Sequence, residues 1–419
     1  MALETPRTTG FQATPGFDST KRRTGLRLRA VLALVLAIVA GYSTAQRLEG
    51  FDWRYTKPDF RIFYSWGIDR LDGRDIWAEP AAGMVRPGIS RRFCNFTPFF
   101  VEAFTPLAHL SQRTGHRVWQ GIVLGGLIAA LVLLARGIEP PLDVATTVIF
   151  VSLVVVSQTT REVLKFSQMS PLLLPPMVIS WLASRRGRPM VAGLALAAAV
   201  LLKLYPGAFA GYLLLKRRWL ELGWTAVFCA AGIALSGPGN WVNMFTLGIP
   251  PSLPWILTRN SLHASVLPVV HSLLAHSALF MRGNPPWRAV LAVTAVIDLV
   301  LIALVACATF RADDNVEQDG IVFGLWLGLC VMLSPLAWRH DLPLFFPLYL
   351  FAALAIVRLL AIQAAWTRAD FISGCALLAG SSAIELIHSI PDPNPQLILA
   401  MLIFVASLLI LRARIALRI

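Results

Sequence analysis

Residues 185–218 read RRGRPMVAGLALAAAVLLKLYPGAFAGYLLLKRR, an apolar stretch with a cluster of basic residues at each end. Loops on the cytoplasmic side of a membrane carry an excess of Lys and Arg, so both clusters are predicted to lie in the cytoplasm. The apolar stretch between them must then cross toward the outer side and return. The break is predicted at Pro206, which leaves Lys203 at the outer end of the first half.

The composition of the whole chain agrees with a membrane environment. The protein has 419 residues, of which 56% are hydrophobic and 14% are charged, whereas soluble domains average about 25% charged residues. The formal net charge of +14 is concentrated in short segments between apolar runs. This distribution is typical of membrane flanks and speaks against nucleic-acid binding. The five cysteines show no CxxC spacing, so neither a structural disulfide nor a metal site is predicted.

Apolar runs that suit a bilayer recur along the chain, and a helical span needs about 20 such residues. Counting 190–216 as two short crossings gives about twelve. The even number puts both basic ends, residues 21–29 and 412–418, in the cytoplasm. A further span at 264–281 would place the C-terminus outside, so this segment is predicted to be re-entrant or interfacial. The predicted crossings lie at 26–46, 117–136, 142–158, 166–184, 190–216, 223–237, 287–310, 320–337, 343–363, 371–389 and 395–411.

The predicted fold is therefore an all-α, polytopic transmembrane helical bundle with interfacial helices on its extracytoplasmic face. Residues 1–25 are expected to be a disordered cytoplasmic tail, followed by a first helix that is retained rather than cleaved as a signal peptide. The membrane domain would occupy 26–412, with a cytoplasmic end at 413–419. Two long segments, 47–116 and 238–286, would lie outside the cytoplasm, so any chemistry is expected there.

Asp59 opens an amphipathic pattern in the first of these outer segments. From Phe60 onward, apolar and polar residues alternate at helical spacing, with Asp69 on the polar face, which predicts a helix along the membrane surface. Asp59 follows Pro58 at the helix start, where Asp is a preferred N-cap residue. Two compatible roles stay open for Asp59: a helix cap, and a carboxylate base at the membrane face.

Ionisable groups within apolar runs are costly in hydrocarbon and indicate functional sites. Lys203 is the strongest candidate, because a cation at an outer helix end can bind a phosphate; a lysine there can also simply extend toward the interface. His340, at a predicted outer edge, can contact a phosphate or transfer a proton, or form a polar cap between two helices. Arg92 can meet an anionic headgroup or flank the membrane. It precedes a phenylalanine-rich stretch predicted to be an interfacial aromatic belt.

Several short motifs follow one another in a characteristic order: Asp59-Phe60, an aromatic segment ending in Pro106, Ser167-Gln168-Met169-Ser170, Lys203-Leu204-Tyr205-Pro206, Asn260-Ser261-Leu262, and Ser334-Pro335-Leu336-Ala337-Trp338-Arg339-His340. Together they resemble glycosyltransferase family 87, the polyprenol-phosphate-mannose-dependent α-mannosyltransferases with the type C fold. The family usually has Gly at the position of Ser167, often has Tyr-Pro-Pro where this chain has residues 95–98, and often has paired histidines after the Trp. The resemblance extends from about residue 50 to about residue 410 and rests on the order of the motifs.

The resemblance implies an inverting hexosyltransferase of the inner membrane. The donor would be a polyprenyl-phosphate sugar, with mannose as the expected hexose, and the acceptor a glycolipid or polysaccharide of the cell envelope. Asp59 would act as the base. Lys203, Arg259 and His340 would contact the departing phosphate, with Arg92 as a weaker candidate. Gln168 and Asn260 lie in the motifs and are expected to contact substrate.

No metal or cofactor is expected, since protein cations can hold a leaving monophosphate. A transporter or flippase of a lipid-linked or small solute is the alternative, because it would also have many crossings, broken helices and intramembrane charges. The sequence shows no convincing internal repeat, and its outer segments are longer than a minimal carrier needs. Both features favour the enzyme.

Overall fold

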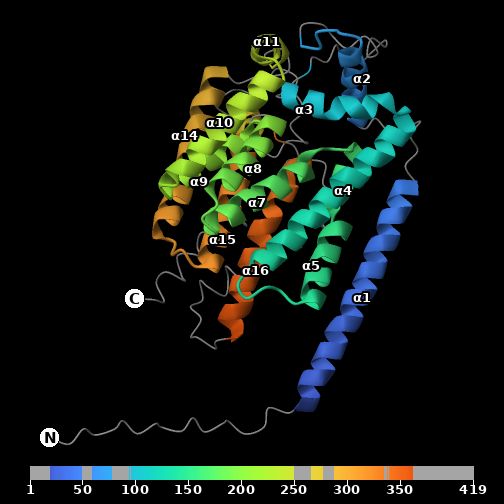
Figure 1. Ribbon diagram of the computed structural model, residues 1–419. Coiled ribbons are helices and arrows are strands. Elements are labelled where there is room, and N and C mark those ends of the chain that lie inside the picture. The colour runs from blue at the N-terminus through green and yellow to red at the C-terminus, as the bar shows by residue number, and fades with distance from the viewer. Residues whose placement is uncertain are drawn as a thin grey trace, which may run out of the picture.

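The computed structural model describes residues 19–49, 59–77, 94, 96–249, 266–276, 287–334, 337 and 339–361. Every regular element within these ranges is a helix, so the predicted all-α class is confirmed. Long helices form a slanted bundle, with α2, α3 and α11 gathered at one end and α1 standing at the side (Figure 1). Helix α1 begins at Ser19 and packs on α5, so it starts inside the segment predicted to be a disordered tail.

The helices in chain order are α1 (Ser19–Glu49), α2 (Phe60–Leu71), α3 (Pro98–Phe104), η2 (Thr105–His109), α4 (Gln112–Gly137), α5 (Val144–Val156), α6 (Gln158–Phe166), η3 (Ser170–Leu173), α7 (Leu174–Arg185), α8 (Pro189–Leu202), η4 (Tyr205–Phe209), α9 (Ala210–Leu215), α10 (Trp219–Leu235), α11 (Pro238–Asn243), η5 (Met244–Gly248), α13 (Val266–His276), α14 (Trp287–Arg311), α15 (Val316–Leu333), η9 (Arg339–Phe345) and α16 (Phe346–Ala361).

Several of these helices are suited to a bilayer. In the described ranges, α4, α14 and α15 are each long and apolar enough to cross it, and two bent pairs, α5 with α6 and α10 with the α11–η5 segment, raise the number to five if each pair is one span. Helix α8 is apolar but shorter. These helices indicate a membrane protein. The count of about twelve crossings stays a prediction, and 371–389 and 395–411 lie outside the described residues.

The predicted break in residues 190–216 is present. Helix α8 ends at Leu202, Lys203 is extended with φ −156° and ψ 135°, and the chain resumes as η4 and then α9. Pro206 lies in the first turn of η4, and its ring and missing N–H prevent α8 from continuing through it. The break places Lys203 at the end of α8 rather than inside a helix.

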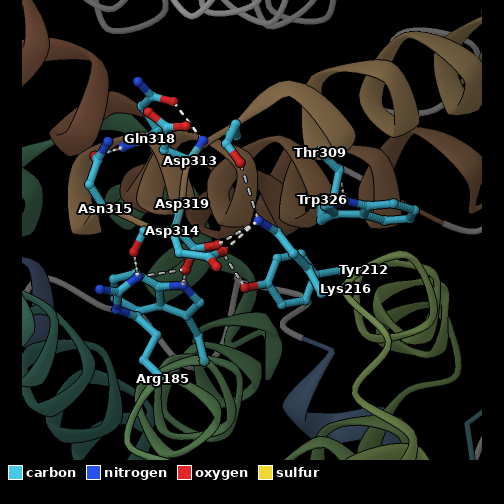
Figure 2. A network of polar contacts seen from close by, with 12 residues as sticks. Arg185, Tyr212, Lys216, Thr309, Asp313, Asp314, Asn315, Gln318, Asp319 and Trp326 are labelled. Carbon is cyan, nitrogen blue, oxygen red and sulfur yellow. Dashed lines mark hydrogen bonds and ion pairs between the residues drawn. The ribbon is translucent and has the colours of Figure 1, made fainter.

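The two basic clusters that flank this segment lie at the same end of the bundle. Arg185 and Lys216 both approach Asp319 near the start of α15, with N–O distances of 3.0 and 3.9 Å (Figure 2). The carbonyl of Pro206 instead accepts a 4.0 Å contact from the Cys330 Sγ, about three turns or about 16 Å farther along α15. The chain between the clusters therefore runs out and back.

Asp319 is the buried centre of this network. Its carboxylate accepts hydrogen bonds from the Trp181 Nε1 at 2.9 Å, the Tyr212 hydroxyl at 2.9 Å and the Arg185 Nη1 at 3.0 Å, and Figure 2 shows Arg185, Tyr212 and Lys216 converging on it. A buried charge is tolerated when it is paired and hydrogen-bonded. The network thus joins α7, α9 and α15 at the end of the bundle remote from Lys203.

At the opposite end, one side of α2 packs on α3 and η2. The Phe63 ring lies 4.9 to 5.7 Å from the rings of Phe96, Phe100 and Phe104, so these phenylalanines belong to a buried core and not to an interfacial belt. Asp69, predicted on the polar face, is only 5% exposed, while Leu71 is 43% exposed. The predicted exposure of Asp69 is wrong: Arg74, just after the end of α2, contacts its carboxylate at 3.4 Å, whereas α3 and η2 pack near Gly67.

Candidate active site

The carboxylate of Asp59 is directed toward the chain segment 166–168. Gln168 donates a hydrogen bond from its Nε2 to the Asp59 Oδ2, and the Asp59 backbone N–H donates to the Phe166 carbonyl at 3.0 Å. Asp59 occupies the N-cap position of α2, but its side chain makes no capping hydrogen bond. The predicted cap is therefore wrong. Asp59 has helical φ and ψ of −63° and −16°, whereas a capping residue is typically extended.

Gln168 is fixed by the turn that ends α6. Its side chain is 2% exposed, and because Asp59 offers only acceptors, the Gln168 amide must present its Nε2 to Asp59 and its Oε1 elsewhere. That Oε1 is buried and accepts no hydrogen bond within the described part of the chain. The turn therefore places a buried acceptor without a hydrogen bond beside the carboxylate.

The turn itself passes through Ser167, which adopts a left-handed conformation with φ 54° and ψ 42°. This conformation costs a non-glycine residue about 1–2 kcal/mol. Helix α4 supports it from one side: the His116 Nε2 lies 2.7 Å from the Ser167 Oγ, and the Trp119 Nε1 donates to the Ser167 carbonyl at 2.8 Å. Local contacts with α4 thus determine where Gln168 points.

Asp341, in η9, forms a second cluster with Ser170, which lies two residues after Gln168. It is fully buried, and its carboxylate accepts hydrogen bonds from the Ser170 hydroxyl, from the Lys203 Nζ at 2.8 and 3.0 Å and from the Tyr205 hydroxyl at 3.0 Å. The Lys203 ammonium also lies 4.9 Å from the centroid of the Tyr205 ring. Lys203 is thus a paired cation, while its side chain keeps 15% exposure. His340 is buried directly before Asp341.

The two clusters meet because α6 and η3 both pack against η9. The segment 166–170 carries Gln168 toward Asp59 and Ser170 toward Asp341. The structure therefore brings Asp59, Gln168, Lys203 and His340 into one region from distant parts of the sequence. The predicted residues Arg92, Arg259 and Asn260 lie outside the described residues.

Sequence reasoning gave no individual role to four residues that hold this region together: Ser170 and Tyr205, which lie in the quoted motifs, and Asp341 and His116. An acidic partner such as Asp341 could have been expected, because a cation such as Lys203 at the edge of an apolar run needs an opposite charge. The sequence alone offered no way to choose among the acidic residues. The contact of His116 with Ser167 had no local signal at all.

The arrangement combines a carboxylate that can accept a proton, an amide beside it, and a cation oriented by a buried carboxylate. Among the described residues, no three His, Cys, Asp or Glu side chains are grouped so that they could hold a metal ion. Groups of this kind suit the transfer of a polar group from an anionic leaving group to a hydroxyl.

Comparison with known proteins agrees with this chemistry. Residues 94–335 match the family model of glycosyltransferase family 87, a range that includes Gln168 and Lys203 and leaves Asp59 and His340 on either side. The comparison with curated proteins gives no match. Because the family match covers more than half of the sequence, the chain belongs to glycosyltransferase family 87, whose members transfer a sugar from a donor to an acceptor.

Proposed function

We propose that this protein transfers a hexose, mannose by analogy with the family, from a polyprenyl-phosphate sugar to a cell-envelope glycolipid or polysaccharide. The observation that carries the proposal is the position of the Asp59 carboxylate, which is bonded to Gln168 in the same turn that reaches the Lys203–Asp341 pair. A base and a paired cation thereby stand on either side of one short segment.

In the proposed reaction, Asp59 takes the proton from the acceptor hydroxyl. The acceptor oxygen attacks the anomeric carbon of the donor sugar as the bond from that carbon to the phosphate oxygen breaks. Polyprenyl monophosphate leaves on the opposite face, so the anomeric configuration inverts. The buried Oε1 of Gln168 has no partner among the described residues, so it can accept a hydrogen bond from a substrate hydroxyl that enters the site.

Lys203 and His340 are proposed to stabilise the departing phosphate. Two of the three ammonium hydrogens of Lys203 are accounted for by its two bonds to Asp341, which leaves one for a phosphate oxygen. Arg259, Arg92 and Asn260 keep their proposed roles in substrate binding. Protein cations would then stabilise the negative charge on the leaving phosphate.

The proposed topology has about twelve crossings in the inner membrane, with both termini in the cytoplasm and the site on the extracytoplasmic face. Its support is the location of the basic clusters at 185–188 and 216–218 at one end of the bundle, while Lys203 lies at the other. Short cytoplasmic loops are the ones enriched in Lys and Arg.

The test uses purified protein in proteoliposomes with radiolabelled polyprenyl-phosphate mannose and cell-envelope lipids. Asp59→Asn keeps the shape of the side chain and removes the base, so kcat should fall by about 10²- to 10⁴-fold. Asp72→Asn, at the exposed far end of α2, is the matched control and should retain wild-type transfer. Asp59→Asn at wild-type rate would remove Asp59 from the mechanism.

The same assay separates the enzyme from the transporter. Label that becomes covalently attached to an acceptor lipid supports transfer. Label that only changes sides of the membrane, still on its polyprenyl carrier, supports the transporter. Membership of a glycosyltransferase family favours the first outcome.

A further inference from the structure

His116 contacts the chain neighbours of both partners in the Asp59–Gln168 hydrogen bond. Its ring centroid lies 5.0 Å from that of Phe60, the residue that follows Asp59, in an edge-to-face arrangement. Its Nε2 lies 2.7 Å from the Oγ of Ser167, the residue that precedes Gln168. One buried side chain on α4 therefore touches the neighbour of the carboxylate and the neighbour of the amide.

The contact with Ser167 acts on the orientation of Gln168. The backbone reverses at Ser167 through its left-handed conformation, and the N–H of Gln168 donates to the Val163 carbonyl at 3.0 Å, which closes the end of α6. Rotation of this turn would swing the Gln168 amide away from Asp59. The Ser167 hydroxyl contacts His116 on α4 directly. A glycine at this position would have no side chain to make that contact.

The surroundings of His116 leave little room for another arrangement. Both His116 and Ser167 are buried, and Trp119, one turn further along α4, donates its Nε1 to the Ser167 carbonyl at 2.8 Å. The turn is thus held at its side chain by His116 and at its backbone by Trp119. Both residues also reach α2, Trp119 through the Phe63 ring at 6.2 Å and His116 through Phe60, but of the two it is His116 that contacts the residue next to Asp59.

We propose that His116 is a positioning residue for the transfer reaction: it holds the Ser167 turn and Phe60 in register, so that Gln168 orients the carboxylate of Asp59. This inference rests on the proposed function of Asp59 as the base. His116 itself would touch neither donor nor acceptor. Loss of His116 should therefore slow the chemical step and leave donor affinity nearly unchanged.

The first test compares His116→Leu with His116→Gln, whose amide nitrogen can take the place of Nε2. Misplacement of a reacting group by a fraction of an ångström to an ångström costs up to about a hundredfold in rate, so His116→Leu should lower kcat at least tenfold with the donor KM within about twofold. His116→Gln should recover most of the loss. His109→Leu, an exposed histidine on η2, is the matched control. An unchanged kcat in His116→Leu, or a loss that falls mainly on KM, would overturn the proposal.

The second test asks whether His116 acts through Gln168. In a Gln168→Ala background, the further substitution His116→Leu should change kcat by less than about twofold, because the coupled residues share one effect. Losses that multiply would show that His116 acts by another route. Ser167→Gly, which suits the left-handed backbone but removes the hydroxyl, should likewise make His116→Leu nearly neutral.

A readout independent of catalysis separates failure of this inference from failure of the proposed function. Hydrogen exchange of the amides in residues 160–170 should be faster in His116→Leu than in wild type, and unchanged in His109→Leu. Unchanged exchange in His116→Leu would overturn the proposed positioning role of His116. If exchange is faster in His116→Leu but the wild-type protein transfers no sugar, the proposed function is rejected. The positioning role of His116 is then still supported.

Discussion

The Nζ of Lys203 lies 2.8 Å from the Oδ1 and 3.0 Å from the Oδ2 of Asp341. The cation that the sequence offers most clearly as a phosphate ligand is thus already oriented by a fully buried carboxylate. Ser170 and Tyr205 donate to the same carboxylate. An anion approaching Lys203 would meet an ammonium whose direction is set before binding.

Removal of one member of this pair should be costly. Asp341→Asn leaves the Lys203 charge without its partner, and loss of one partner of a buried pair typically costs about 3–5 kcal/mol. The more exposed pair of Arg70 and Glu102, 2.6 Å apart, provides the control: Glu102→Gln should cost less than about 1 kcal/mol. Thermal unfolding in detergent measures both. Equal, small shifts of the melting temperature would contradict a stabilising role for the buried pair.

A second carboxylate beside Asp59 should change the pH dependence of transfer. Gln168→Glu places a like charge next to Asp59, which raises the pKa of Asp59. The base works in its deprotonated form, so the acid limb of kcat/KM should move to higher pH. Gln112→Glu, at the start of α4, adds the same charge away from Asp59 and should leave the profile in place. If the acid limb of kcat/KM in Gln168→Glu is not shifted, the limb reports the titration of a group other than Asp59.

Close packing of α15 on α16 predicts a steric effect at Gly324. A Cβ added there would lie 2.6 Å from the Cα and 2.7 Å from the backbone nitrogen of Leu348, and backbone cannot move aside as a side chain can. Gly324→Ala should therefore destabilise the protein by about 1–3 kcal/mol. Gly125→Ala on α4 meets nothing within 4 Å and should be neutral or stabilising by up to about 1 kcal/mol. Similar melting temperatures for the two variants would argue against this packing.

Membrane orientation can be tested with single cysteines. In a background lacking the five natural cysteines, Asp72→Cys should react with a membrane-impermeant maleimide added to spheroplasts, and Arg186→Cys should react only after permeabilisation. Both positions are exposed, and they lie at opposite ends of the bundle. The reverse labelling pattern would invert the proposed topology. A reporter fused at the C-terminus should report the cytoplasm, and an external reporter signal would contradict an even number of crossings.

Local signals in the sequence predicted the parts of this fold that depend on local chemistry. The helical class follows from the apolar runs, and the break at Lys203 follows from Pro206, which acts on its own neighbours. The position of the two basic clusters at one end followed from charge alone.

The errors and omissions concern contacts between distant residues. The cap assigned to Asp59 failed because Gln168, 109 residues later, competes for the carboxylate. Asp341 was overlooked because its partner, Lys203, lies 138 residues away. A single sequence contains each of these residues but does not state which ones meet.

The separation of Lys203 from Asp341 along the chain has a consequence for synthesis. Ribosomes add about 5–20 residues per second, so on the order of ten seconds pass between the appearance of the lysine and that of its carboxylate. During this interval the nascent protein must keep an uncompensated ammonium near an apolar segment. In the proposed topology, the extended residue at the end of α8 lets that ammonium reach the headgroup region. On that topology, the break lets the insertion machinery accommodate the lysine before its partner carboxylate has been synthesised.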